Sequence, residues 1–123
     1  MLFEDFITIQ GHKLLVMIDR QGYIEFDDHE GRLRQRPPGD RQLELRTLSG
    51  DEQARKRLAH EQTEFGIRFK LDPVTFEKIQ EWESISEAGF STPSQESQLD
   101  DLLEQIFWRE INPYLINPLI SDL

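Results

Sequence analysis

Cysteine is absent from this chain of 123 residues. Disulfide bonds, thiolate metal sites and cysteine nucleophiles are therefore excluded. Long apolar runs are missing too, since no stretch approaches the roughly 20 apolar residues that cross a membrane. The acids Glu4 and Asp5 stand where a secretory signal peptide needs a basic region. These absences predict a cytoplasmic protein without membrane association, and a reducing compartment is compatible with them.

Sequence motifs of catalysis and cofactor binding are also missing. No glycine-rich phosphate loop occurs, and the histidines His12, His29 and His60 are scattered along the chain. The segment FDDHEG at 26–31 groups carboxylates with an imidazole, a combination that could hold a divalent metal. Neighbours on a strand end point in different directions, however, and no second cluster at ligand spacing completes the site. We therefore expect no cofactor, no metal and no catalytic residues. The alternative is an enzyme whose site residues are dispersed in the sequence.

Acidic residues outnumber basic ones, and the formal net charge is −10 at pH 7. The two signs are unevenly placed: residues 32–57 hold eight Lys or Arg and four Asp or Glu, whereas residues 73–123 hold two and ten. Such asymmetry indicates either a charged partner or charge complementarity within the protein. With 37% hydrophobic residues and eight phenylalanines, the chain can bury a core as one domain, residues 1–123.

Residues 1–72 are predicted to be mainly antiparallel sheet. Alternating apolar residues predict strands at 3–9 and 23–27. The segment 13–19 between them is apolar on both faces, which is typical of a central strand covered on both sides. Short turns connect these segments, so they should form a meander, and the alternating segment 66–71 adds a later strand.

Five arginines lie in the segment HEGRLRQRPPGDRQLELR, residues 29–46. We expect a β-hairpin here, because one register places Leu33 opposite Leu45 and Arg34 opposite Glu44. That register keeps apolar side chains on one face and charges on the other. The candidate anion-binding residues on the charged face are Arg32, Arg34, Arg36 and Arg46. They could bind phosphate or nucleic acid, contact an acidic partner, or form a solvated face neutralised by the protein's own acids.

Three helices are expected. The capping box SGDE opens a helix at about 50–64. The dipeptide Asp-Pro at 72–73 supplies the N-cap and first residue of a second helix. Residues 88–98 are polar and contain Gly and Pro, which is typical of a linker. A strongly amphipathic helix follows at 99–111, so the part of the chain at 73–123 is predicted to be helical.

Large apolar side chains recur after residue 110, where chain ends are commonly polar. Such a segment either docks on the protein's own core or binds another chain, including a second copy. Trp108 favours a partner, because it lies off the main apolar stripe of its helix and tryptophan is enriched at interfaces. The candidate partner-binding residues are Trp108, Ile111, Tyr114, Leu115, Ile116, Leu119 and Ile120.

The sequence therefore predicts a single α+β domain, an antiparallel β-meander of five to six strands packed with about three helices. The expected function is that of a small non-enzymatic protein-binding module, such as an assembly factor, adaptor or inhibitor. It would use the apolar C-terminal segment and the arginine-rich hairpin to bind another protein or a second copy. The alternative is anion or nucleic-acid binding through the hairpin.

Overall fold

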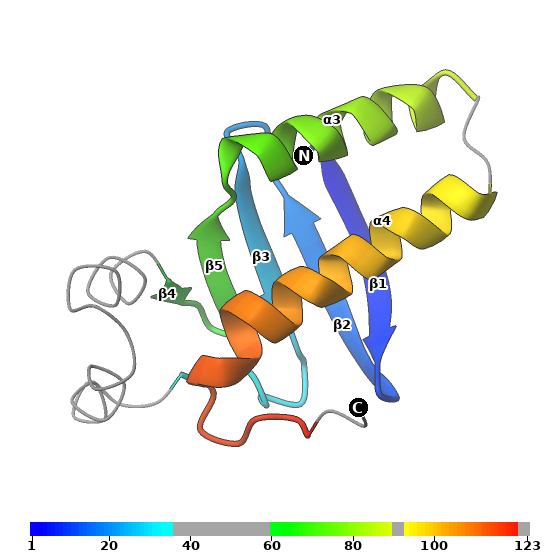
Figure 1. Ribbon diagram of the computed structural model, residues 1–123. Helices are drawn as coiled ribbons and strands as arrows, with labels where there is room; N and C mark the ends of the chain where they lie inside the picture. Colours follow the sequence, from blue (N-terminus) through cyan, green and yellow to red (C-terminus); the bar gives the residue numbers. More distant parts are fainter. Residues whose placement is uncertain (36–59, 90–92, 121–123) are drawn as a thin grey trace.

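The computed structural model describes residues 1–35, 60–89 and 93–120 (Figure 1). These residues form a five-stranded antiparallel sheet with the order β1-β2-β3-β5-β4. Two α-helices, α3 and α4, lie together on one face of that sheet (Figure 1). The predicted α+β class and the antiparallel sheet are therefore confirmed.

The first three strands form the predicted meander. They are β1 (Phe3–Ile9), β2 (His12–Ile18) and β3 (Tyr23–Asp27), each antiparallel to the next. Gln10 and Gly11 join β1 to β2 with φ angles of 49° and 80°. Two successive positive φ angles make a type I′ turn, whose twist matches that of the flanking strands. The alternation of apolar residues and this turn together determine the register of β1 on β2.

The remaining strands are β5 (Gly66–Lys70), which pairs with β3, and β4 (Glu61–Gln62), which pairs with the outer side of β5. The prediction of a helix at about 50–64 is wrong at its end, because Glu61–Gln62 is extended. The side chain of Gln62 donates hydrogen bonds to the carbonyls of Leu33 and Gly66, at 2.9 and 2.7 Å. These tertiary contacts favour the extended form over local helix propensity, and residues 50–59 lie outside the described ranges.

The described part of the chain therefore contains two α-helices where about three were expected. The first is α3 (Pro73–Glu87), which begins where the sequence predicts. The carboxylate of Asp72 accepts the backbone N–H of Thr75 at 3.0 Å and caps the helix. Its winding apolar stripe buries Ile79 completely, whereas Phe76 and Trp82 are half-buried.

The second helix, α4 (Pro93–Ile106), begins within the predicted linker, so the boundary at 88–98 is wrong. Proline in this segment indicated a loop, but proline is also a favourable first residue of a helix. A π-helical turn (Phe107–Ile111) and a short 3₁₀ turn (Asn112–Tyr114) continue the chain. No helix in the part of the chain described here is long and apolar enough to cross a membrane.

The arginine-rich hairpin falls largely on residues that the structure does not describe. Arg32–Gln35 forms no regular strand, and Gln35 makes one isolated antiparallel bridge with Leu115. The predicted pairs of Leu33 with Leu45 and of Arg34 with Glu44 include undescribed partners.

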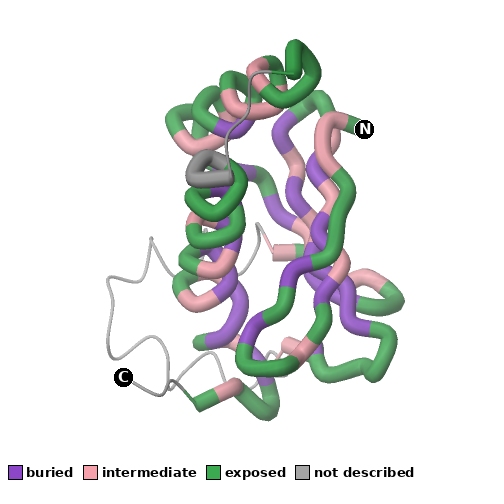
Figure 2. Tube along the Cα trace, turned by 90° about the vertical axis from the view of Figure 1, so that its right-hand side faces the viewer, coloured by how far each residue is buried: buried purple, intermediate pink, exposed green. Residues whose placement is uncertain are grey.

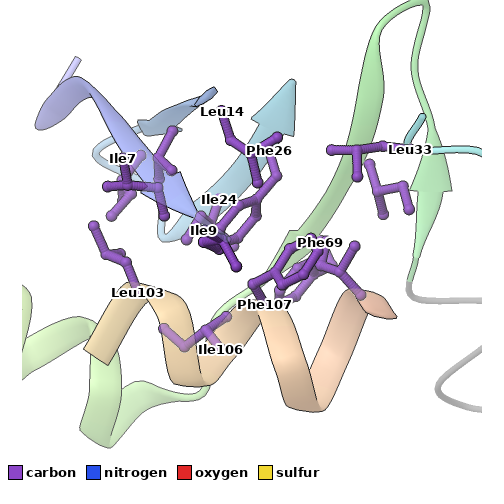
Figure 3. Packing of buried hydrophobic residues seen from close by; sticks show 14 of the residues in the cluster. Ile7, Ile9, Leu14, Ile24, Phe26, Leu33, Phe69, Leu103, Ile106 and Phe107 are labelled. Atoms are coloured by element: carbon purple, nitrogen blue, oxygen red, sulfur yellow. The ribbon is translucent and has the colours of Figure 1, made fainter. Parts of the chain in front are cut away.

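The core lies between the sheet and the two helices (Figure 3). Leu14 and Phe26 from the sheet face Leu103 and Phe107 from the α4 side (Figure 3). On the opposite face Leu15 and its neighbours in β2 are only half-buried. The prediction that β2 is covered on both faces is wrong, because both described helices pack on the same side. The uncovered side is called the open face below.

Candidate functional site

The helices do not cover the sheet evenly. At the end that contains Phe107 and Ile111, which we call the closed end, side chains pack tightly against β3 and β5. At the opposite end, above the first residues of β1, a hollow of about 430 Å³ remains between β1, α3 and α4. We call this hollow the acidic groove. It is lined by Leu2, Phe3, Glu4, Asp5, Trp82, Glu83, Ser86, Glu96, Leu99 and Asp100.

Negative charge dominates the acidic groove. Five of its lining residues carry carboxylates, and the lining residues include no Lys, Arg or His. Burial raises the pKa of Glu83 above its ordinary value, and the nearby charges of Glu87 and Asp5 raise it further. Burial and then the charge of Asp5 likewise raise the pKa of Asp100. The carboxylates therefore repel one another, and a cation placed among them would be stabilised.

Apolar side chains form the rest of the wall. Phe3 and Trp82 are half-buried, and Leu99 is buried against the core. The ammonium group of Lys78 lies 5.3 Å from the ring centroid of Trp82. Trp82 also lines a second hollow of about 270 Å³, together with Lys78 and Gln105. This indole therefore stands between two hollows, and its ring already accepts one cation.

The acidic groove borders the edge strand of the sheet. Within the described ranges, β1 pairs with β2 alone, so its outer side has no strand partner. Figure 2 shows this strand facing the viewer with no described segment in front of it. The backbone N–H of Phe6 donates to the carboxylate Oδ1 of Asp5 at 2.8 Å. An acid of the groove therefore caps a backbone donor of the exposed edge.

The predicted partner-binding residues of the C-terminal segment divide into three groups. Ile111 and Leu115 are buried, which corresponds to docking on the protein's own core. Trp108, Tyr114 and Leu119 are half-buried. Ile116 and Ile120 are 52% and 84% exposed.

Several hydrogen bonds hold this segment. The indole N–H of Trp108 donates to Glu104 at 3.3 Å. The side chain of Asn112 donates to the carbonyl of Leu119 at 2.9 Å and accepts its N–H at 2.7 Å. Residues 112–119 are thus closed into a loop on the core, and among the described residues of this segment Ile116 and Ile120 are the most exposed large apolar side chains.

Both described arginines of the predicted anion-binding set contact the chain itself. Arg32 pairs with Glu30, lies 4.0 Å from a carboxylate oxygen of Asp28, and contacts the His12 ring. Arg34 donates to the backbone carbonyls of residues 63 and 64 at 3.2 and 2.6 Å. The other two members, Arg36 and Arg46, lie beyond the described residues.

A different carboxylate pair lies on the open face of the sheet. Glu25 and Asp27 are two residues apart on β3, so their side chains share one face. Burial raises the pKa of Glu25 to about 7, and hydrogen bonding to Asp27 with charge repulsion adds to the effect. Neither residue lines either of the two hollows described above. In the described ranges, no group of three or more His, Asp or Glu side chains is arranged to hold a metal.

Sequence reasoning missed the acidic groove. The uneven distribution of charge indicated a charged partner or charge complementarity within the protein, but it did not place the acids of the helices in a site. One local signal was present: Trp82 and Leu99 are each followed directly by an acid, Glu83 and Asp100. This pattern also occurs at the boundary of any amphipathic helix, and it does not say that the two pairs meet.

Comparison of the chain with known protein families, curated proteins and solved structures finds no match in any of the three. A functional conclusion must therefore come from the geometry and charge described above.

Proposed function

We propose that this chain is a small protein-binding module whose acidic groove receives a basic segment of a partner protein. The observation that carries the proposal is the set of mutually repelling carboxylates, among them Asp5, Glu83 and Asp100, around a half-buried tryptophan. Repulsion of this kind costs stability in the free protein. A bound cation removes that cost, so binding and relief of repulsion act together.

Arginine and lysine side chains fit the remaining features of the groove. Their aliphatic stems can pack on Phe3 and Leu99, while the charged heads approach the carboxylates. The face of Trp82 adds cation–π attraction, which contributes about 0.5–1 kcal/mol at exposed sites. A volume of about 430 Å³ suits a few side chains of an extended segment. Nucleic acid and other anions would be repelled here.

This proposal keeps the predicted class of function but moves its main site. The predicted surface was the apolar C-terminal segment with the arginine-rich hairpin. Ile111 and Leu115 are enclosed in the core, which leaves Ile116 and Ile120 as exposed apolar contacts. Those two residues serve below as a control for peptide binding.

The proposal is tested with a labelled basic peptide, acetyl-Val-Arg-Val-Arg-Val-Arg-amide, by fluorescence anisotropy. We expect binding at low ionic strength that weakens as salt is added, since the contacts are electrostatic. The double variant Glu83→Gln with Asp100→Asn should lower the affinity about tenfold, because each exposed charge pair contributes about 0.2–1 kcal/mol.

A matched control removes the same amount of charge elsewhere. Glu77 and Glu81 are exposed on α3 and do not line the groove. The variant Glu77→Gln with Glu81→Gln should change the affinity less than twofold. Equal losses in the two double variants would show that only net charge matters and would contradict the proposal. Absence of binding at low salt would contradict the proposal as well. A second control, the double variant Ile116→Ser with Ile120→Ser, should leave peptide binding unchanged.

A further inference from the structure

We infer that the basic segment binds as a sixth strand, paired with the free edge of β1, and that its basic side chains occupy alternate positions. This inference rests on the proposed function and specifies the kind of partner. It follows from three observations: the direction of the backbone groups of β1, the contact between Asp5 and Phe6, and the face on which each side chain lies.

The type I′ turn decides which backbone groups of β1 point outward. In such a hairpin the two residues that flank the turn, Ile9 and His12, exchange hydrogen bonds. Pairing alternates from there along the strand, so the odd-numbered residues of β1 bond to β2. The N–H and C=O groups of Glu4, Phe6 and Thr8 therefore point away from the sheet, as required for an added strand.

The hydrogen bond from Phe6 to Asp5 agrees with this direction. The Phe6 N–H would have no carboxylate partner if it pointed into the β1–β2 ladder, yet it donates to Asp5 Oδ1 at 2.8 Å. A carbonyl of an added strand would take this donor. The displaced carboxylate of Asp5 would then be available to a basic side chain of the incoming segment. Asp5 thus protects the edge in the free protein and contributes to recognition in the complex.

The alternation of side chains gives the pattern of the partner. Asp5 lies on the same face of β1 as Phe3 and Ile7, which is the face that the helices cover. Phe6 lies on the open face and is 47% exposed. In a strand paired with β1, every second side chain would enter the acidic groove, and the others would lie beside Phe6. The expected segment therefore alternates Arg or Lys with apolar residues.

A second copy of the same strand fits this edge poorly. Residues 1–9 contain the acids Glu4 and Asp5 and no basic residue. Pairing two copies of β1 would bring four carboxylates to one short edge, and like charges across a strand pair are destabilising. β1 also contains no lysine or proline, the residues that commonly prevent pairing at an edge strand, so its edge is open to a strand of suitable charge. An oppositely charged segment of another protein is therefore the occupant that the charges favour.

The test uses two N-methylated forms of acetyl-Val-Arg-Val-Arg-Val-Arg-amide with the intact chain. One form carries methyl groups on the three valine nitrogens, and the other carries them on the three arginine nitrogens. A paired strand donates through alternate amides only, so one form should lose at least twentyfold in affinity and the other less than threefold. Which form fails depends on whether the strand runs parallel or antiparallel to β1. Equal losses, or none, would overturn the inference.

Amide hydrogen exchange gives a second readout on the protein. The amides of Glu4, Phe6 and Thr8 should exchange quickly in the free chain and at least tenfold more slowly with the unmethylated peptide. If the peptide binds through Glu83 and Asp100 but these amides are unchanged, the added strand is disproved and the proposed function stands. If the peptide does not bind, the proposed function itself fails. A doubled mass by light scattering, without peptide, would instead make a second copy the occupant and overturn the inference.

Discussion

The closed end and the acidic groove are built from the same two layers, yet they differ in almost every property. At the closed end Phe107, Ile106 and Ile111 are fully buried, and the ring of Phe107 lies 6.1 Å from that of Phe26. At the groove the corresponding space between helices and sheet is bordered by carboxylates and a half-buried indole. Packing at one end can therefore hold the fold together while the other end stays open for binding.

The largest expected effect on stability comes from removing a buried side chain at the closed end. Phe107→Ala should lower the free energy of unfolding by about 3–5 kcal/mol, because a buried aromatic ring is replaced by a cavity. Chemical denaturation measured by tryptophan fluorescence and circular dichroism checks this value. The matched change at the groove, Phe3→Ala, removes a half-buried ring and should cost no more than about 2 kcal/mol. Equal losses at the two sites would contradict the division between a stabilising and an open end.

An intermediate effect is expected where the C-terminal segment closes on the core. Asn112→Ala should lower the free energy of unfolding by about 1–3 kcal/mol, since it removes both bonds to the Leu119 backbone and leaves those groups without partners. The same variant should increase hydrogen exchange at Leu119 and leave exchange in β1 unchanged. A loss below about 0.5 kcal/mol would show that this loop is not part of the closed end.

The smallest expected effect is at the groove. There the variant should gain stability, whereas the variants described above lose it. Asp100→Asn should raise the free energy of unfolding at pH 7 by a few tenths of a kcal/mol, because the variant removes a charge that burial disfavours and that Asp5 repels. The raised pKa of Asp100 means that the folded state binds its proton more readily than the unfolded state. Wild-type stability therefore recovers as the pH falls through that pKa, and the advantage of the variant should disappear there.

Thermal unfolding at a series of pH values measures this difference. The control Glu77→Gln changes an exposed carboxylate of α3 that lies outside the groove, and it should give no comparable gain. A variant at residue 100 that is less stable than the wild type at pH 7 would show that the groove carboxylates do not repel one another.

Local features of the fold could be predicted because each depends on neighbouring residues. The alternation in β1 and β3, the turn at Gly11 and the cap at Asp72 were all readable from short segments of sequence. Errors arose where distant residues decide. The side chain of extended Gln62 donates to the carbonyl of Leu33, which is 29 positions away in the sequence, and nothing near Gln62 indicates that partner.

The candidate site was beyond prediction for the same reason. Asp5, Glu83 and Asp100 come from three elements that are separate in the chain, and each acid taken alone is typical of a solvated surface. The apolar C-terminal segment could be recognised as unusual from the sequence, but only the structure shows that Ile111 is buried and Ile120 is exposed.

The sequence by itself determined the antiparallel class of the sheet, the start of α3 and the uneven distribution of charge, because these follow from composition and short-range periodicity. Only the tertiary structure decided that both helices cover one face of the sheet and that a hollow remains between them and β1. The acids of the groove meet because β1, α3 and α4 all border that hollow. Packing at Phe107 closes one end of the layer, whereas among the described residues no comparable buried ring lies between Asp5 and Trp82 at the other end.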